Sequence, residues 1–279
     1  MVAWLFARTA GSRFVMRIED LDPAASDATV ADGQLDDLAA LGLDWDEPVV
    51  WQHEHRERYD AAIAALEDAG LTYPCFCTRR EIQQAGVAPH GPAPEGAYPG
   101  TCRDLSPAER ARRQAEGRPA ALRVRADATR VRIVDRLRGP VEVEVDDLVV
   151  RRNDGVVAYN LAVVVDDAGQ GVGEVVRGDD LLLSSPRQSF LARLLGLPPV
   201  DYAHVPLVLG PDGKRLAKRD GAVTLSDRVA LGESPGAVRS RLAASLGLCG
   251  PGESVSMAQL AERFDPARLP TEPWVLSAS

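Results

Sequence analysis

A Gly- and Pro-rich stretch divides this chain and restricts the folds open to it. Residues 84–100 carry too many glycine and proline residues to form a helix or a strand. Before this stretch, Phe14–Ile18 has the apolar pattern of a buried strand, and two amphipathic helices follow that end at Gly42 and Gly70. Apolar strand patterns resume after it. We therefore expect an α/β fold in which a parallel sheet is interrupted by an inserted subdomain.

The sheet should resume in the second half of the chain. Residues 122–151 contain four short β-type segments, two of which alternate apolar with charged side chains. The turn sequence Asn153–Gly155 predicts a hairpin into Val156–Val165, whose nearly continuous apolar run is typical of a central buried strand. Ser185 with the following proline then predicts the start of a helix.

These patterns divide the chain into four predicted parts. They are the first part of an α/β domain (1–73), an inserted cysteine-containing subdomain (74–150), the second part of the α/β domain (151–225) and a short, mainly helical C-terminal region (226–279). In open α/β sheets, ligands bind at the carboxyl ends of the strands, so the site should lie there.

Composition indicates a soluble, cytoplasmic protein. The chain has 279 residues, 45% of them hydrophobic, but no apolar run of the roughly 20 residues that a membrane span needs. It begins without a signal peptide pattern. The formal net charge is −9, yet residues 103–138 hold 11 Arg against 5 acidic residues. That stretch is either a basic RNA-binding face or an ordinary solvated surface.

Lysine is confined to one loop. Of the 32 basic residues only Lys214 and Lys218 are lysines, and both lie in the glycine-flanked segment 210–221 with Arg215 and Arg219. A mobile loop with compact positive charges suits the phosphates of a nucleotide in a transition state. It is not a Walker A motif, and a solvated basic loop is the alternative.

Two further groups of side chains suit a small charged ligand. Glu19, Asp20 and Asp22 follow the first predicted strand and could hold an amino group or Mg²⁺, or the two aspartates could cap the next turn. Arg177 emerges from an apolar run and could bind a carboxylate, or it could form an ion pair with the acidic residues that follow it. Tyr159 lies on a neighbouring predicted strand and could instead be core.

Three of the four cysteines surround the Gly- and Pro-rich loop. Cys75, Cys77 and Cys102 could bind Zn²⁺ with a fourth donor, for which His90 is one candidate. Reduced core cysteines are the alternative. The His53-Glu-His55 sequence could also bind a metal, although a position on a helix is the simpler interpretation.

Together these segments resemble the class I aminoacyl-tRNA synthetases of the glutamyl type. The matching segments follow the family's order over roughly residues 3–225: Phe14–Asp22, Trp51-Gln52 with Arg56 and Tyr59, Val175–Leu181, and Arg215–Arg219 in the place of the KMSKS motif. About 60 residues follow that loop. The chain is therefore most similar to the family's short branch, which lacks an anticodon-binding domain and attaches glutamate to queuosine in tRNA(Asp).

The resemblance implies a Rossmann-like parallel sheet, a role for each candidate residue, and glutamate, ATP with Mg²⁺ and tRNA(Asp) as partners of a monomer. Glu19 would take the amino group of glutamate, Arg177 its side-chain carboxylate, and Tyr159 would line the pocket. Lys218 would act in catalysis and, with Lys214 and Arg215, bind ATP. The zinc ligands would be Cys75, Cys77, Tyr98 and Cys102.

One region departs from the family's pattern. The family's first strand and HIGH motif have no counterpart, because Trp4–Arg8 already matches the end of the helix that would follow them. We therefore expect a sheet without its first strand and with unpaired backbone groups. A misplaced start, a catalytically inactive glutamate- or tRNA-binding paralogue, and a short glutamyl-tRNA synthetase acting on tRNA(Glu) are the alternatives. Ala217, where a serine is usual, is a milder difference.

Overall fold

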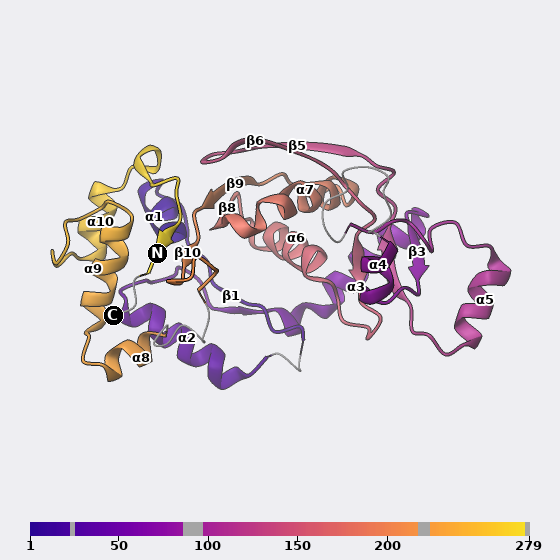
Figure 1. Cartoon of the computed structure of the whole chain (residues 1–279), viewed down its shortest axis with the longest axis horizontal. Helices are drawn as coiled ribbons and strands as arrows, with labels where there is room; N and C mark the ends of the chain where they lie inside the picture. The colour runs from indigo at the N-terminus through magenta and orange to yellow at the C-terminus, as the bar shows by residue number, and fades with distance from the viewer. Residues whose placement is uncertain (23–25, 86–96, 217–223, 277–279) are drawn as a thin grey trace.

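The structure is a computed structural model that describes residues 1–22, 26–85, 97–216 and 224–276. The molecule is elongated, with the C-terminal helices at one end, helix α5 at the other and the largest sheet between them (Figure 1). No helix in the described ranges is long and apolar enough to cross a membrane.

Ten α-helices are present in the described residues. Their bounds are α1 Val2–Thr9, α2 Ala28–Ala40, α3 Arg56–Asp68, α4 Arg79–Ala85, α5 Pro107–Ala115, α6 Tyr159–Gln170, α7 Ser185–Leu194, α8 Leu225–Ala230, α9 Pro235–Ser245 and α10 Met257–Arg263. Three short 3₁₀ helices are η1 Gln52–His55, η2 Asp179–Ser184 and η4 Pro266–Arg268.

The strands form four sheets. Their bounds are β1 Arg17–Ile18, β2 Val50–Trp51, β3 Thr72–Cys75, β4 Ala121–Val124, β5 Arg130–Asp135, β6 Gly139–Glu144, β7 Val149–Arg151, β8 Glu174–Gly178, β9 Asp201–Val205, β10 Val208–Leu209 and β11 Trp274–Val275. The strand orders are β1-β2, β10-β11, β3-β4-β7 and β6-β5-β9-β8. The parallel pairs β1-β2 and β8-β9 belong to separate sheets, so the expected parallel sheet is divided.

A cavity of about 630 Å³ lies where the two parallel pairs approach each other. Residues 14–17 line it from β1 and the segment before it, and residues 173–176 line it from β8. No hydrogen-bonded pairing joins β1 to β8 in the described part of the chain. The cavity therefore lies beside the segment that leads into β1 and the amino-terminal part of β8, and Glu19, directly after β1, also lines it.

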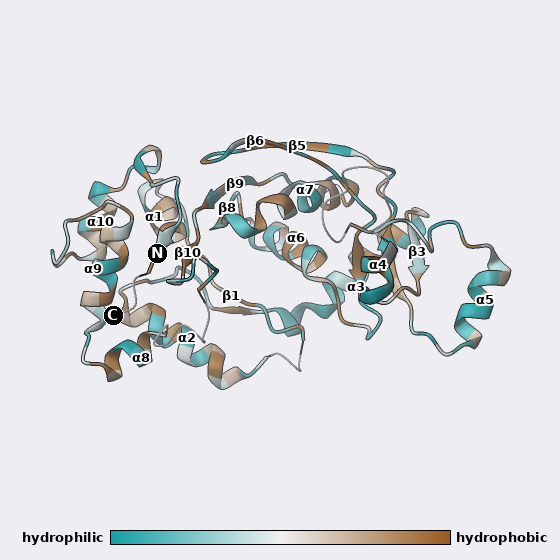
Figure 2. Ribbon diagram, viewed as in Figure 1, coloured by the Kyte–Doolittle hydropathy of each residue, from teal (hydrophilic) through white to brown (hydrophobic). Residues whose placement is uncertain are grey.

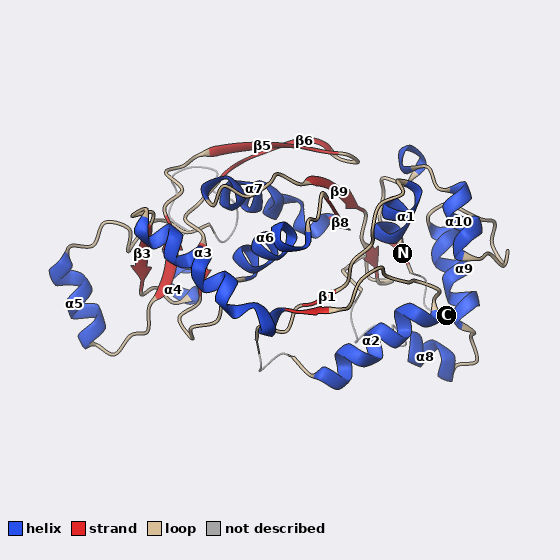
Figure 3. Ribbon diagram, turned by 180° about the vertical axis from the view of Figure 1, so that it is seen from behind, coloured by secondary structure: helices blue, strands red, loops and turns tan. Residues whose placement is uncertain are grey.

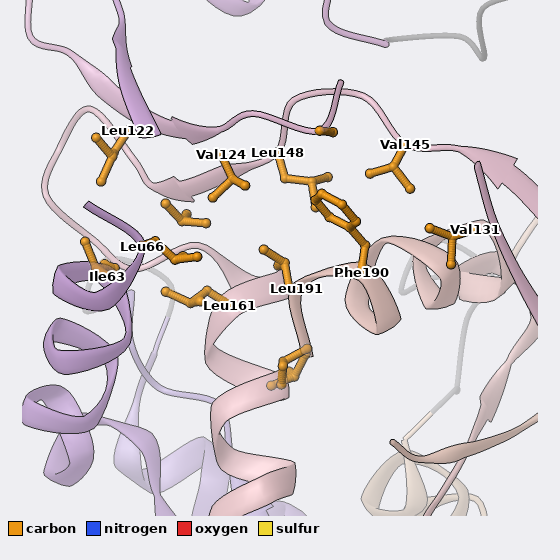
Figure 4. Packing of buried hydrophobic residues seen from close by; sticks show 14 residues of the cluster. Ile63, Leu66, Leu122, Val124, Val131, Val145, Leu148, Leu161, Phe190 and Leu191 are labelled. Atoms are coloured by element: carbon orange, nitrogen blue, oxygen red, sulfur yellow. The ribbon is translucent and has the colours of Figure 1, made fainter. Parts of the chain in front are cut away.

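The apolar run Val156–Val165 is mostly helix, so the predicted central strand is wrong. The predicted turn does form, since Val157 bridges back to Arg151, but α6 begins two residues later. Four consecutive residues of α6 are buried: Leu161, Ala162, Val163 and Val164. Leu161, Val163 and Val164 belong to one core cluster with residues of α3, α7 and nearby strands (Figure 4), and Ala162 packs in a second cluster with Leu21 and Tyr59. A helix buried on most sides has the same continuous apolar run as a buried strand.

Several other predicted elements are confirmed. The first residues form α1, and Gly11 follows it with φ +64°, a conformation that favours glycine. Tyr59, Ile63 and Leu66 are buried on one face of α3. The strand predicted at Phe14–Ile18 is shorter than expected, because only its last two residues pair with β2. Hydropathy colouring places the apolar faces of α3, α6 and α7 inward (Figure 2).

The hairpin β5–β6 belongs to the largest sheet, although it lies within the predicted insertion 74–150. Its first strand pairs with β9 at Asp135 and Tyr202, and the hairpin covers α7 (Figure 3). This pairing places Asp135, the last residue of β5, next to Tyr202, the second residue of β9. Asp135 consequently lies beside His204, 69 residues later in the chain.

Candidate active site

Arg17, at the start of β1, is held against α6 by acidic and amide side chains. Its Nη2 lies 2.9 Å from Asp167 Oδ1, and its Nη1 donates to Gln170 Oε1 at 2.7 Å. Its Nε lies 3.6 Å from Oδ2 of the buried Asp166, which also accepts a hydrogen bond from the Tyr59 hydroxyl. Burial raises the pKa of Asp167, and the Arg17 charge opposes that shift. The charge of Arg17 is therefore balanced within the protein.

Arg177, on β8, has neutral partners instead. Its Nε donates to His204 Nε2 at 3.1 Å, and its Nη2 donates to Ser185 Oγ at 2.7 Å and to Gln188 Oε1 at 2.8 Å. Its guanidinium also lies over the ring of Tyr202, 5.7 Å from the centroid. These contacts fix the orientation of the guanidinium without neutralising its charge.

The acidic residues after Arg177 pair with other arginines. Asp179 Oδ2 lies 2.6 Å from Arg138 Nη2, and Asp180 Oδ2 lies 2.7 Å from Arg215 Nη1. No ion pair joins Arg177 to a carboxylate among the residues that the structure describes. The alternative of a local ion pair for Arg177 is therefore wrong.

Glu19 and Tyr159 lie within the electrostatic influence of Arg177. Burial raises the pKa of both side chains. The charge of Arg17 and, more weakly, that of Arg177 oppose this shift at Glu19, and the Arg177 charge opposes it at Tyr159. Tyr159, the first residue of α6, is 42% exposed, so ordinary core packing does not explain it. The three side chains interact electrostatically, and their roles toward glutamate stay predictions.

Glu19 borders two hollows. One is the cavity between β1 and β8, and the other, of about 730 Å³, is lined by Trp51, His53 and Arg56 and by the start of α2. In the second, Asp20 accepts hydrogen bonds from the backbone N–H and the ring of His53. Asp22 lies 2.7 Å from Arg152 Nη1. Glu19, Asp20 and Asp22 are not part of a group of three or more potential metal ligands in the described ranges.

The lysine loop is described only in part. Lys214 Nζ lies 3.7 Å from Asp212 Oδ2, and Arg215 pairs with Asp180 on η2. The side chains of Lys214 and Arg215 are both 73% exposed. Lys218, with Ala217 and Arg219, lies outside the described residues. The predicted roles of this loop toward ATP stay predictions.

The cysteine cluster forms as predicted. The sulfur atoms of Cys75, Cys77 and Cys102 all lie within 4.8 Å of one another. The Tyr98 hydroxyl lies 3.4 Å from Cys75 Sγ and 4.0 Å from Cys77 Sγ. Burial raises the pKa of Cys77 to about 12. Four donor atoms surround one point, an arrangement that fits tetrahedral Zn²⁺. His90 lies outside the described residues.

Other candidate metal ligands do not cluster in the described ranges. The three cysteines are the only group of three or more potential ligands found there, so His53 and His55 are not part of such a group. Cys249 is remote from the cluster, and its thiol donates to the Ser240 carbonyl at 3.4 Å.

Many arginines of the 103–138 stretch are engaged in ion pairs. Arg103 contacts Asp147 at 2.5 Å, Arg118 contacts Glu81 at 2.7 Å, and Arg138 contacts Asp179. These pairs involve residues of loops, of α4 and of η2. Part of the local positive charge is consequently used within the fold.

The side chains that orient Arg177 were not predicted from the sequence. Ser185 and Gln188 lie on α7, His204 on β9 and Asp135 on β5. They come from three elements separated by up to 69 residues, so no spacing pattern could unite them. The only local signal was a histidine inside an apolar strand.

Comparison with known proteins identifies the family of this chain. A sequence model of the tRNA synthetases class I (E and Q), catalytic domain, matches residues 1–277. The glutamyl-Q tRNA(Asp) synthetase of Nocardia farcinica is 62% identical over 277 residues, covering 99% of this chain and 86% of that protein. The protein of the same name from Symbiobacterium thermophilum is 48% identical over 285 residues, covering 98% and 88%.

The fold agrees with a solved structure of the same class. A glutamate tRNA ligase from Elizabethkingia meningosepticum, crystallised in complex with its amino acid, superimposes with a TM-score of 0.78 and 25% identity. The match covers 99% of this chain, which spans 63% of the length of that ligase. The chain belongs to the class I tRNA synthetases (E and Q) and, among them, to the glutamyl-Q tRNA(Asp) synthetase family.

Proposed function

We propose that this chain activates L-glutamate with ATP and transfers it to queuosine in the anticodon of tRNA(Asp). The observation that carries the proposal is the Arg177 guanidinium, which neutral groups orient while its charge remains available toward Glu19 and Tyr159. The names of the relatives from Nocardia farcinica and Symbiobacterium thermophilum support the same substrate and acceptor. We expect the enzyme to act as a monomer in the cytoplasm.

Glutamate has one ammonium and two carboxylates, and the site offers a matching set of groups. Glu19 is the candidate partner of the ammonium. Arg177 is the candidate partner of the side-chain carboxylate, which it can bind through two parallel N–H groups. Tyr159 closes the space between them and offers a hydroxyl. The α-carboxylate is then free to attack the α-phosphate of ATP, with release of pyrophosphate.

The first chemical step needs positive charge at the phosphates rather than a general base. The glutamate carboxylate is already ionised at neutral pH, so no proton has to be removed before it attacks. We propose that Lys218, with Lys214 and Arg215, stabilises the charge that develops on the phosphates. The Arg215 pair with Asp180 supports this role, because it ties the loop to the element that follows Arg177.

The experiment that tests this function is glutamate-dependent ATP–pyrophosphate exchange without tRNA, followed by charging assays. We expect exchange, and then transfer of glutamate to queuosine-containing tRNA(Asp) but not to tRNA(Glu). Charging of tRNA(Glu) would instead identify a short glutamyl-tRNA synthetase. Binding of glutamate or tRNA without exchange would identify a catalytically inactive binding protein.

We further propose that Cys75, Cys77, Cys102 and Tyr98 hold a structural Zn²⁺. The spacing of their donor atoms and the buried position of two of the thiols support this set. Replacement Cys75→Ser should reduce zinc from about one ion per chain to well below one, because three ligands bind the ion far more weakly. Metal analysis of protein purified without chelator measures this change. Cys249→Ser is the matched control and should retain the ion.

A further inference from the structure

A buried pair of side chains lies directly behind Arg177. Asp135 Oδ2 lies 2.6 Å from His204 Nδ1, and both side chains are completely buried. On its other side, the same imidazole accepts the hydrogen bond from Arg177 Nε through Nε2. The Ser185 hydroxyl lies 3.2 Å from that nitrogen. Asp135, His204 and Arg177 thus form one chain of contacts that ends at the site.

The protons in this chain have one consistent arrangement. Arginine N–H groups only donate, so His204 Nε2 must accept and carry no proton. Burial lowers the pKa of His204, which favours the neutral ring. Although burial opposes it, the hydrogen bond from His204 lowers the pKa of Asp135, which remains a carboxylate. The single ring proton is therefore on Nδ1 and is donated to Asp135.

We infer that the Asp135–His204 pair positions Arg177 and thereby sets the selectivity of the site for a carboxylate over an amide side chain. A carboxylate in direct contact with Arg177 would neutralise it and compete with the substrate. The imidazole separates the Asp135 carboxylate from the Arg177 guanidinium and fixes the position of Arg177 Nε. The Nη groups therefore keep both their positive charge and their orientation toward the substrate. The inference rests on the proposed function, since the ligand it concerns is the side-chain carboxylate of glutamate.

The backbone around Asp135 allows a substitution that reverses the proton arrangement. Asp135 Oδ1 accepts three backbone N–H groups, from Leu137 at 3.0 Å, Arg138 at 2.9 Å and His204 at 3.2 Å. In Asp135→Asn that position must remain an oxygen, so the new NH₂ group faces His204 Nδ1. The ring would then accept at Nδ1 and carry its proton on Nε2, where it opposes Arg177 Nε–H.

Asp135→Asn in the full chain tests the inference. We expect the glutamate KM in pyrophosphate exchange to rise about tenfold or more, the preference for glutamate over glutamine to fall, and the ATP KM to stay within about twofold. The ¹⁵N resonances of His204 should report the change of tautomer. A folded variant with the switched tautomer and an unchanged glutamate KM would overturn the inference.

Two variants at position 204 give a second test if Asp135→Asn does not fold. In His204→Gln the amide oxygen can take the place of Nε2 and accept from Arg177, whereas in His204→Asn the shorter amide can reach only Asp135. We expect the glutamine variant to keep the glutamate KM within about threefold and the asparagine variant to lose about tenfold. Equal effects of the two would refute the positioning role.

The test also separates this inference from the proposed function. If glutamate does not bind to the unmodified chain in calorimetry, the proposed function fails. The ¹⁵Nε resonance of Arg177 still measures whether Asp135→Asn moves the guanidinium, and a shift there would support the positioning role alone. No shift, with the tautomer switched, would overturn it.

Discussion

Two arginines lie on β1 and β8, strands of two separate sheets, and their surroundings differ. Arg17 on β1 meets Asp166 and Asp167, while Arg177 on β8 meets a hydroxyl, an amide and a neutral imidazole. Both side chains are fixed, but only Arg17 has its charge balanced. The difference shows that hydrogen bonding and charge compensation are separate properties of a buried arginine. A ligand carboxylate gains most at the arginine that lacks a carboxylate partner.

The comparison predicts that Arg177→Ala has the largest effect on activity. Removing the charge that receives the substrate carboxylate should lower kcat/KM for glutamate about 100-fold or more, because one partner of a close charge pair is lost. Glutamate-dependent pyrophosphate exchange measures this loss. Arg193→Ala, on the exposed side of α7, is the matched control and should behave as the unmodified chain. A comparable loss in that control would show that arginine removal alone damages the protein.

The opposite result is expected for the residues around Arg17. A substitution there should change the free energy of unfolding more than it changes the glutamate KM. Asp166→Asn weakens the buried contacts to Tyr59, Gln52 and Arg17, and should lower the free energy of unfolding by about 2 kcal/mol. Denaturant unfolding followed by circular dichroism measures this change. If Asp166→Asn left stability intact while raising the glutamate KM tenfold, Arg17 would belong to the binding site and the contrast would fail.

The grouping of the three cysteines could be predicted from their spacing around one loop. Glu19, Tyr159 and Arg177 were proposed from motifs, and their roles toward glutamate stay predictions. Tyr159 was assigned to a strand because an apolar run of this length does not distinguish a buried helix from a buried strand. The Asp135–His204 contact was beyond reach, because it depends on the pairing of β5 with β9, and strand pairing between distant segments leaves no local pattern.

Glu19 should give an intermediate effect with a characteristic pH dependence. Glu19→Gln removes the negative charge proposed for the ammonium group and should raise the glutamate KM about tenfold. Burial raises the pKa of Glu19, so in the unmodified chain the glutamate KM should rise as the pH falls from neutral toward that raised pKa. The variant should lack this rise. Steady-state kinetics over a pH series distinguishes the two.

The same pKa shift fixes the sign of a stability change. A carboxyl group whose pKa is higher in the folded state binds its proton more tightly there, so ionised Glu19 costs stability at neutral pH. That cost disappears as the pH falls through the raised pKa toward the value of the unfolded chain. Glu19→Gln should therefore be more stable than the unmodified chain at neutral pH. Lower stability at that pH would indicate that Glu19 has a structural partner.

Tyr159→Phe should have the smallest effect on the glutamate KM. It tests whether a neutral group near Arg177 matters less for binding than the charge of Arg177 itself. The hydroxyl adds no charge at neutral pH, and four hydrogen bonds to other residues hold the Arg177 guanidinium. Losing one neutral hydroxyl from the proposed pocket should raise the glutamate KM about threefold and leave kcat nearly unchanged. Pyrophosphate exchange at saturating ATP measures both constants. A loss of kcat/KM as large as that of Arg177→Ala would mean that the Tyr159 hydroxyl, rather than the buried His204 imidazole, orients Arg177.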